Sequence, residues 1–350
     1  MRLFPLLGVC AVFAAPVLPS GGADEEGLPD HVTPQVVQSV DAGLAYLAEI
    51  QAPDGGFTTT RDGAQYPVAM TALAGMAFLA SGSTSSRGPW AEPIAKAQRF
   101  LMDRSTQTGL IADATEDSGR PMFGHGFALL FLATLYGMEN DPVARREMSS
   151  VIERAVTLTA RGQSNLGGWM YNPGGGDEGS VTITQMQGLR AAHNSGFVVP
   201  QDCVDMAIGY LERCRTSEGG IRYSASSGDS TELPITAAAV ATLYNAGDYD
   251  SELAGECLEY TFKALEALER LSVSGSEGHV YYTHLYASQA FYTAGDTFWE
   301  GYFPRASSLL MEEQSDDGSW MGDGVGTVYG TAIACIVLQL PYKFLPIYQR

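Results

Sequence analysis

Two kinds of apolar pattern alternate along the chain. In the first kind, apolar residues recur every three or four positions with charges on the opposite side, as in Val143 to Arg161. This spacing predicts an amphipathic helix with one side in water. In the second kind, such as Ile235 to Leu243 and Ala332 to Leu340, almost every residue is apolar. That composition is typical of a helix enclosed by other helices.

The two patterns alternate six times, which predicts six helical hairpins. The amphipathic helices are expected at Val36 to Ile50, Pro93 to Asp103, Val143 to Arg161, Asp202 to Arg213, Ser251 to Leu271 and Phe298 to Glu313. The apolar helices are expected at Pro67 to Ala80, Met122 to Tyr136, Val181 to Ser195, Pro234 to Ala246, Tyr281 to Ala294 and Tyr329 to Leu340. Proline near the first turn and glycine soon after the last turn mark many of these apolar helices.

A polar turn, usually rich in glycine, separates the two helices of each hairpin. The six turns read QAPDGGF (51–57), RSTQTGL (104–110), QSNLGGW (163–169), RTSEGGI (215–221), SGSEGHV (274–280) and QSDDGSW (314–320). Six similar units indicate a repeat architecture. Because the first and last units are among the most apolar, an open stack would leave apolar ends in water. The sequence therefore predicts an all-α (α/α)6 toroid, six inner helices inside six outer ones, with a tail from Tyr342 over one end.

The 350 residues are 45% hydrophobic and 17% charged, which suits a globular chain with a large core. No linker interrupts the repeats, so we expect one domain over 36–350. Residues 1–23 have a basic residue, an apolar segment and small residues before Asp24, which is the layout of a signal peptide. Export to a secreted or periplasmic location and a flexible leader over 24–35 follow from this interpretation. An uncleaved interfacial anchor is the alternative.

The net charge of −20 argues against nucleic acid and against anionic lipid surfaces as partners. After signal cleavage no stable membrane insertion is expected, because the apolar N-terminal segment is too short for an ordinary spanning helix. Four cysteines would remain, at Cys203, Cys214, Cys257 and Cys335. Cys203 and Cys214 would lie about 16 Å apart on one helix, too far to bridge. We expect four buried thiols, with a bridge between Cys203 and Cys257 as the alternative.

Three of the turns carry a family resemblance. QAPDGGF, QSNLGGW and QSDDGSW resemble the QW repeat of squalene and other terpenoid cyclases, and the whole pattern is similar to the prenyltransferase β-subunit family. The resemblance to this terpenoid cyclase and protein prenyltransferase superfamily covers all six units. It implies the same toroid, in which the glutamine and the aromatic residue of each turn form a structural staple outside the ring.

The chemical motifs of that superfamily are not reproduced. Cyclases that protonate an alkene carry a D-x-D-D-T-A segment, whereas the nearest segment here, ELPITA (232–237), has Pro234 and Ile235 in place of the central acids. Protein prenyltransferases hold zinc with an Asp-x-Cys pair and a distant histidine. The corresponding helix start, SVTIT (180–184), has no cysteine, although His284 is present. We therefore expect no metal and no other cofactor.

Polar side chains on the apolar helices and in the loops before them are the candidates for binding. They are His125, Gln185, Arg190, His193, Tyr286 and Gln289, together with Asp177 and Glu178 from the glycine-rich segment 171–180. Tyr282, Tyr286 and Gln289 share one helix face. If that face lines the ring axis, the cavity suits an isoprenoid, a lipid or a carbohydrate. The alternative is hydrogen bonding between packed helices.

The loops before the apolar helices are also rich in acids. These are Asp62, Asp113, Glu116, Asp117, Asp177, Glu178, Asp229, Glu232 and Asp323. Inner helices that all point the same way would gather these loops at one rim. Capping of helix N-termini accounts for such acids. A rim that binds a divalent cation or a cationic group is the alternative.

Two functional hypotheses follow. The first is an exported, noncatalytic toroid that binds an apolar or amphipathic small molecule or a protein partner. The second is a divergent enzyme that acts in the axial cavity, either a cyclase or transferase, or a lyase or hydrolase. For the enzyme, the sequence offers His284 and Tyr282 as acid and base near Glu232. Fold analogy alone supports a lyase or hydrolase.

Overall fold

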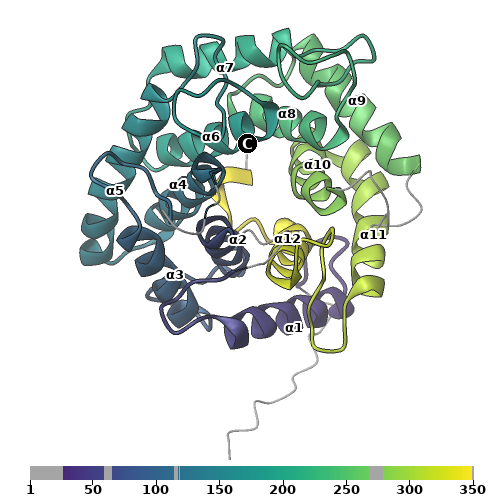
Figure 1. Ribbon diagram of the computed structural model, residues 1–350. Coiled ribbons are helices and arrows are strands. Elements are labelled where there is room, and N and C mark those ends of the chain that lie inside the picture. Colours follow the sequence, from purple (N-terminus) through teal and green to yellow (C-terminus); the bar gives the residue numbers. More distant parts are fainter. Residues whose placement is uncertain (1–26, 59–64, 114–116, 118, 268–278, 349–350) are drawn as a thin grey trace, which may run out of the picture.

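The described residues of the computed structural model form twelve α-helices in two concentric rings (Figure 1). These residues are 27–58, 65–113, 117, 119–267 and 279–348, so the expected signal peptide lies outside them. The outer ring contains α1 (Pro34–Ile50), α3 (Ala91–Asp103), α5 (Pro142–Arg161), α7 (Gln201–Arg213), α9 (Glu252–Ala267) and α11 (Asp296–Glu313). The inner ring contains α2 (Pro67–Leu79), α4 (Pro121–Met138), α6 (Gly179–Asn194), α8 (Leu233–Asn245), α10 (Val280–Ala294) and α12 (Thr327–Gln339). The predicted (α/α)6 toroid is confirmed.

Burial follows the two sequence patterns. Every residue of α2 is buried, whereas α3 buries one stripe of five residues and turns its charges to water. By length and composition α4 could cross a membrane, but 72% of its apolar window is buried inside the ring. It therefore has the burial of a core helix. Val32, just before α1, is only 7% exposed and packs into the core.

The glutamine of three turns ties one repeat to the next. In each case its amide donates to a carbonyl of its own turn and to a carbonyl of the following outer helix. The pairs of acceptors are Gly55 and Pro93 for Gln51, Gly167 and Cys203 for Gln163, and Gly318 and Ser39 for Gln314, all at 2.8 to 3.0 Å. The staple role implied by the family resemblance is therefore what these side chains perform.

The last of these staples closes the ring, because Gln314 reaches back to α1. Two further bonds join the ends of the chain: Tyr46 Oη lies 2.6 Å from Thr327 Oγ1, and Gln339 Nε2 donates to the Ala77 carbonyl at 3.0 Å. The six units form a closed ring, and the two apolar end units cover each other.

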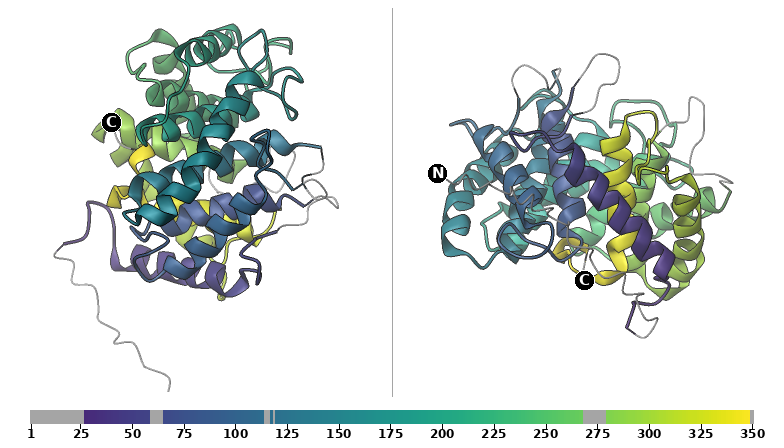
Figure 2. Two further views of the ribbon diagram at one scale, coloured as in Figure 1. Left: turned by 90° about the vertical axis from the view of Figure 1, so that its left-hand side faces the viewer. Right: turned by 90° about the horizontal axis from the view of Figure 1, so that it is seen from below.

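The C-terminal tail covers one end of the ring. It continues from α12 through two short 3-10 helices, Leu340–Tyr342 and Pro346–Tyr348. Lys343 Nζ lies 5.9 Å from the centre of the Tyr292 ring at the end of α10, and the second short helix contacts α6 (Figure 1). The tail therefore crosses the end where the inner helices finish, and the side views show it at the edge of the rings (Figure 2). We call the opposite end, where the inner helices begin, the mouth.

The four cysteines of the described chain are free and buried. Burial raises the pKa of the Cys203 and Cys214 thiols to about 11. The expectation of four buried thiols is confirmed, and Cys203 and Cys257 are not bridged. These thiols remain protonated at neutral pH, so they are poor nucleophiles.

Candidate functional site

The loops at the mouth are bonded to the starts of inner helices. The Tyr171 carbonyl accepts from Met122 N at the start of α4 at 3.0 Å, and the Tyr223 carbonyl accepts from Gly179 N at the start of α6 at 2.8 Å. The Asp323 carboxylate accepts from Tyr281 N at the start of α10 at 3.0 Å. Each loop thus satisfies an otherwise unpaired N–H group of an earlier inner helix. The loops meet at one rim, as the sequence predicts.

Capping and ion pairing account for several rim acids. Asp62 and Glu116 lie outside the described residues, while Asp113 pairs with Arg104 at 3.1 Å and Asp229 accepts from Ser217 Oγ at 2.7 Å. Burial raises the pKa of the Tyr210 phenol, and the nearby Asp177 carboxylate adds to the rise. Among the described residues no group of three or more His, Cys, Asp or Glu side chains could hold a metal ion.

Glu178 is the acid that turns toward the inside of the mouth. Its side chain is 0% exposed and accepts from Val181 N at 2.7 Å, Ser180 N at 3.0 Å and Ser180 Oγ at 2.7 Å. Burial raises the pKa of this carboxyl, and these hydrogen bonds and the charge of Arg120 oppose the rise. The Glu178 carboxyl therefore retains a proton more readily than an exposed glutamate.

Aromatic rings form a throat below Glu178. The Tyr282 ring centre lies 6.4 Å from that of Phe123 and 4.7 Å from that of Tyr286. Tyr282 Oη donates to the Ser180 carbonyl at 3.4 Å, and the fully buried Tyr286 hydroxyl makes no hydrogen bond of normal geometry among the described residues. Burial raises the pKa of both phenols. Both therefore remain neutral hydroxyls.

Three more residues surround the throat at the surface. Tyr171 Oη lies 2.6 Å from Tyr223 Oη, and the Arg120 guanidinium carbon lies 4.6 Å from the centre of the Tyr171 ring. Tyr223 is 41% exposed. A cation over an aromatic face is attracted by the ring quadrupole, so Arg120 is positioned by this stacking. The mouth thus changes from polar at the surface to aromatic inside.

The axis is crossed by side chains below the throat. Gln187 Nε2 of α6 donates to Gln289 Oε1 of α10 at 2.7 Å, although α8 separates these two helices in the ring (Figure 1). Both glutamines are buried. Side chains from nonadjacent inner helices therefore meet at this level and fill the axis of the ring.

The expected acid and base group of His284, Tyr282 and Glu232 is not assembled. His284 Nδ1 lies 2.8 Å from Tyr302 Oη, in a cavity of about 30 Å³ between α9, α10 and α11. Residues two apart on a helix point about 200° apart, so His284 faces the outer ring while Tyr282 faces the axis. Burial raises the pKa of Tyr260 on α9, and the charges of Glu218 and of Glu232, at the start of α8, add to the rise. The three side chains therefore lie in different surroundings.

His125 fills a structural position instead of a binding site. Its Nδ1 accepts from Ile111 N at 3.1 Å, and its Nε2 lies 3.0 Å from Thr159 Oγ1. In four other repeats a threonine hydroxyl accepts the equivalent N–H at 2.9 to 3.0 Å, from Phe57 to Thr71, Trp169 to Thr182, Ile221 to Thr236 and Trp320 to Thr331. The His125 ring therefore replaces that hydroxyl in the second repeat, and burial lowers its pKa to about 4.

The remaining candidates are divided between the two ends. Gln185 Nε2 donates to the Met122 carbonyl at 2.7 Å and so joins α6 to α4, which is the packing alternative. Arg190 and His193 lie near the end of α6, away from the mouth, in a separate pocket. Of the eleven predicted residues, only Glu178, Tyr282, Tyr286 and Gln289 are grouped along the axis.

Sequence reasoning missed four mouth residues, Arg120, Phe123, Tyr171 and Tyr223. Arg120 and Phe123 flank Pro121, the first residue of α4, and the two tyrosines lie in loops that precede α6 and α8. The only sequence feature that marks these residues is their position, because each lies at the start of an inner helix or in the loop before one. Loops positioned on a rigid scaffold commonly carry binding residues.

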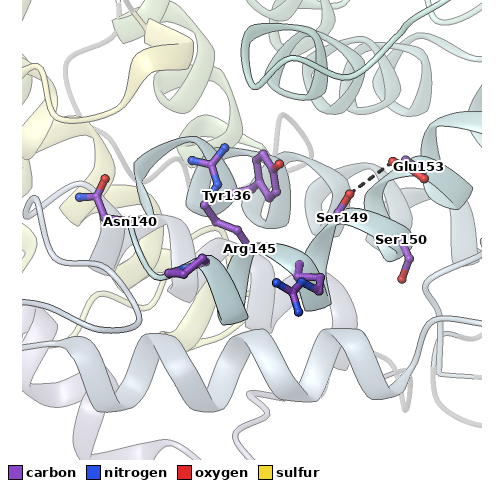
Figure 3. A pocket seen from close by; sticks show the side chains of 8 residues that line it. Tyr136, Asn140, Arg145, Ser149, Ser150 and Glu153 are labelled. Atoms are coloured by element: carbon purple, nitrogen blue, oxygen red, sulfur yellow. Dashed lines mark hydrogen bonds between the residues drawn. The ribbon is translucent and has the colours of Figure 1, made fainter.

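A separate pocket of about 590 Å³ lies outside the ring, between the end of α4 and the start of α5 (Figure 3). Arg145 is already engaged there, because it stacks 4.3 Å from the centre of the Tyr136 ring and donates to the Glu139 carbonyl at 3.2 Å. Ser149 Oγ likewise donates to Glu153 at 3.3 Å (Figure 3). Asn140, Arg146 and Ser150 also line this open groove.

No protein-family model and no curated protein matches the chain. Among solved structures, a type II terpene cyclase of Scytonema, MstE, in complex with geranylgeranyl dihydroxybenzoate, is 16% identical with a TM-score of 0.60, over 89% of this chain and 98% of that one. An α-1,6-mannanase of a Salegentibacter species is 8% identical with a TM-score of 0.64, over 88% and 99%. The chain therefore has a terpenoid cyclase-like toroid fold, which two different activities share.

Proposed function

We propose that this chain is an exported, noncatalytic toroid that binds one small amphipathic molecule of the isoprenoid class at its mouth. The observation that carries the proposal is the change from a polar rim to an aromatic throat. A prenyl-like body would lie against Phe123, Tyr282 and Tyr286, and its polar end would remain among Arg120 and the rim phenols. A fold of this kind holds geranylgeranyl dihydroxybenzoate in MstE.

A carbohydrate fits the same mouth less well. Sugar recognition requires several free polar groups, but the Glu178 oxygens accept from the start of α6 and the Tyr171 and Tyr223 hydroxyls bond to each other. A sugar that displaced these bonds would leave buried groups unpaired, at a cost. The mannanase with this fold was solved with α-1,6-mannotriose, so mannotriose is the appropriate competing ligand.

The mouth favours ligand binding over acid catalysis of the kind that uses two carboxyl groups. Glu178 and Asp323, the two acids whose pKa burial raises at the mouth, are each bound to the start of a different inner helix. Glycoside hydrolysis requires two carboxyl groups that act on one bond. Here neither carboxylate is free of its helix.

Replacing Phe123 by alanine is expected to weaken farnesol binding at least about tenfold, because the ring supplies apolar contact at the throat. Isothermal titration with farnesol measures this. The matched control is Tyr136→Ala, which removes a half-buried ring from the other end of α4. No binding of farnesol, or equal affinities in all three proteins, would contradict the proposal. Mannotriose binding that depends on Tyr223 would support a carbohydrate ligand in its place.

A second candidate function rests on Glu178. A buried carboxyl that keeps its proton beside an aromatic throat is suited to general acid catalysis. If that role exists, the Glu178 carboxyl should titrate above the usual glutamate range in carboxyl-detected NMR, and Glu178→Gln should abolish any turnover of polyprenyl substrates while farnesol still binds. A carboxyl that titrates at or below the usual range would remove this candidate.

Export is tested separately by N-terminal sequencing, with Asp24 as the expected first residue.

A further inference from the structure

A pocket of about 80 Å³ lies at the end of the ring opposite the mouth, between the ends of α6 and α8 and the start of α7. Its walls combine apolar and polar side chains. The apolar ones are Met186, Leu189, Val199, Val204 and Ala246, and the polar ones are Arg190, His193, Gln201, Thr242 and Asn245. No acid lines it, although the chain has 40 acidic and 20 basic residues. The pocket therefore contains the positive charge of Arg190 in a protein whose net charge is negative.

The Arg190 guanidinium has no internal counter-ion. Among the described residues, neither the half-buried Arg190 side chain nor the exposed His193 side chain takes part in a hydrogen bond or ion pair. Other arginines have partners: Arg104 and Arg215 form ion pairs, and Arg145 in the pocket of Figure 3 stacks on Tyr136. An unpaired guanidinium beside apolar walls is suited to receive a carboxylate in a two-pronged bond.

A second observation points to a ligand independently. Thr242 also lines the pocket and is 1% exposed, and its buried hydroxyl has no hydrogen-bond partner among the residues that the structure describes. A buried polar group without a partner is costly, so such groups in native proteins usually meet water or a ligand. Gln201, whose side-chain amide donates to Asp205 at 2.8 Å, begins α7 at the edge of this pocket.

We propose that this pocket binds the carboxylate of a small acid with a short aliphatic chain, with Arg190 as the principal anion-binding residue. The carboxylate lies between Arg190 and the Thr242 hydroxyl, and the chain lies against Val199 and Val204. The volume holds a head group and a few carbons, well below the space that a drug-sized ligand occupies. Val198, 90% exposed beside this wall, extends the apolar surface outward.

The test is titration of the full chain with hexanoate, followed by NMR or calorimetry. We expect saturable binding in the wild-type protein and a loss of at least about tenfold in Arg190→Gln, because a hydrogen bond to a charged group is lost. Arg146→Gln is the matched control, since it removes the same charge from the exposed pocket of Figure 3. It should bind hexanoate as the wild type does.

Three results would overturn the proposal. They are the absence of hexanoate binding, an affinity that Arg190→Gln leaves unchanged in a folded protein, and an equal loss in Arg146→Gln. Inorganic phosphate serves as the second probe. Weak or absent phosphate binding supports the role of the apolar walls, whereas phosphate binding as tight as that of hexanoate would overturn the assignment to aliphatic acids. Farnesol binding at the mouth does not depend on either outcome, so the two proposed sites are tested independently.

Discussion

Replacing Trp320 by alanine is expected to lower the free energy of unfolding by about 4 kcal/mol, since truncation of a buried tryptophan leaves a large cavity. Trp320 is 0% exposed, and its Nε1 donates to the Leu310 carbonyl at 2.6 Å. Its ring packs on Gly43 of α1, where an added Cβ would lie 2.8 Å from Trp320 Cζ3. The side chain therefore joins the last repeat to the first, and its loss weakens ring closure.

Urea unfolding of the wild type, Trp320→Ala and Trp320→Phe measures this effect. The phenylalanine variant keeps most of the apolar contact and loses the indole hydrogen bond, so we expect a loss of about 1 to 2 kcal/mol. A loss below about 1 kcal/mol in Trp320→Ala would show that the last turn is not part of the closed core. The two variants together separate packing from hydrogen bonding.

Acid is expected to destabilise the toroid through His125 and His284. Burial lowers their pKa from 6.5 to about 4 and about 3, and the charge of Arg305 also lowers that of His284. Both folded pKa values lie below the unfolded value, so the unfolded chain binds protons first. Stability from this source is complete above about pH 6.5 and falls as the pH decreases toward the folded values. At pH 4.5 the two residues together cost about 5 kcal/mol.

Chemical unfolding at pH 8 and pH 4.5 checks this prediction. In His284→Asn the difference between the two pH values should shrink by about 2.5 kcal/mol. If His284→Asn keeps the full pH dependence, the imidazole is not excluded from water and the proposed burial of His284 is wrong.

The fold could be predicted because each level of the sequence pointed to the same structure. Apolar periodicity separated inner from outer helices, and the apolar first and last repeats indicated closure, which Gln314 and Tyr46 complete. The turn motif was also informative, because its glutamine and tryptophan side chains donate hydrogen bonds to backbone carbonyls. Such local and repeated signals survive at 16% identity to the terpene cyclase and 8% identity to the mannanase.

The site could be predicted only in part, because a polar residue on a buried helix does not reveal which neighbour it faces. His125 and Thr71 occupy the same position in two repeats and do the same work, which a single histidine does not disclose. His284 and Tyr282 were grouped by nearness in sequence although two positions reverse the direction of a helical side chain. Arg120 and Tyr171 were missed because their stacking joins loops from different repeats.

The central claim is that a small amphipathic molecule enters at the start of the inner helices. A farnesyl probe with a photoreactive group, used with the full chain and followed by mass spectrometry of the labelled peptides, tests it most directly. We expect adducts in peptides that contain Phe123 and Tyr282, and loss of those adducts when unlabelled farnesol is added. Adducts confined to the segment from Arg190 to Val204, or to the outer face of the ring, would contradict it.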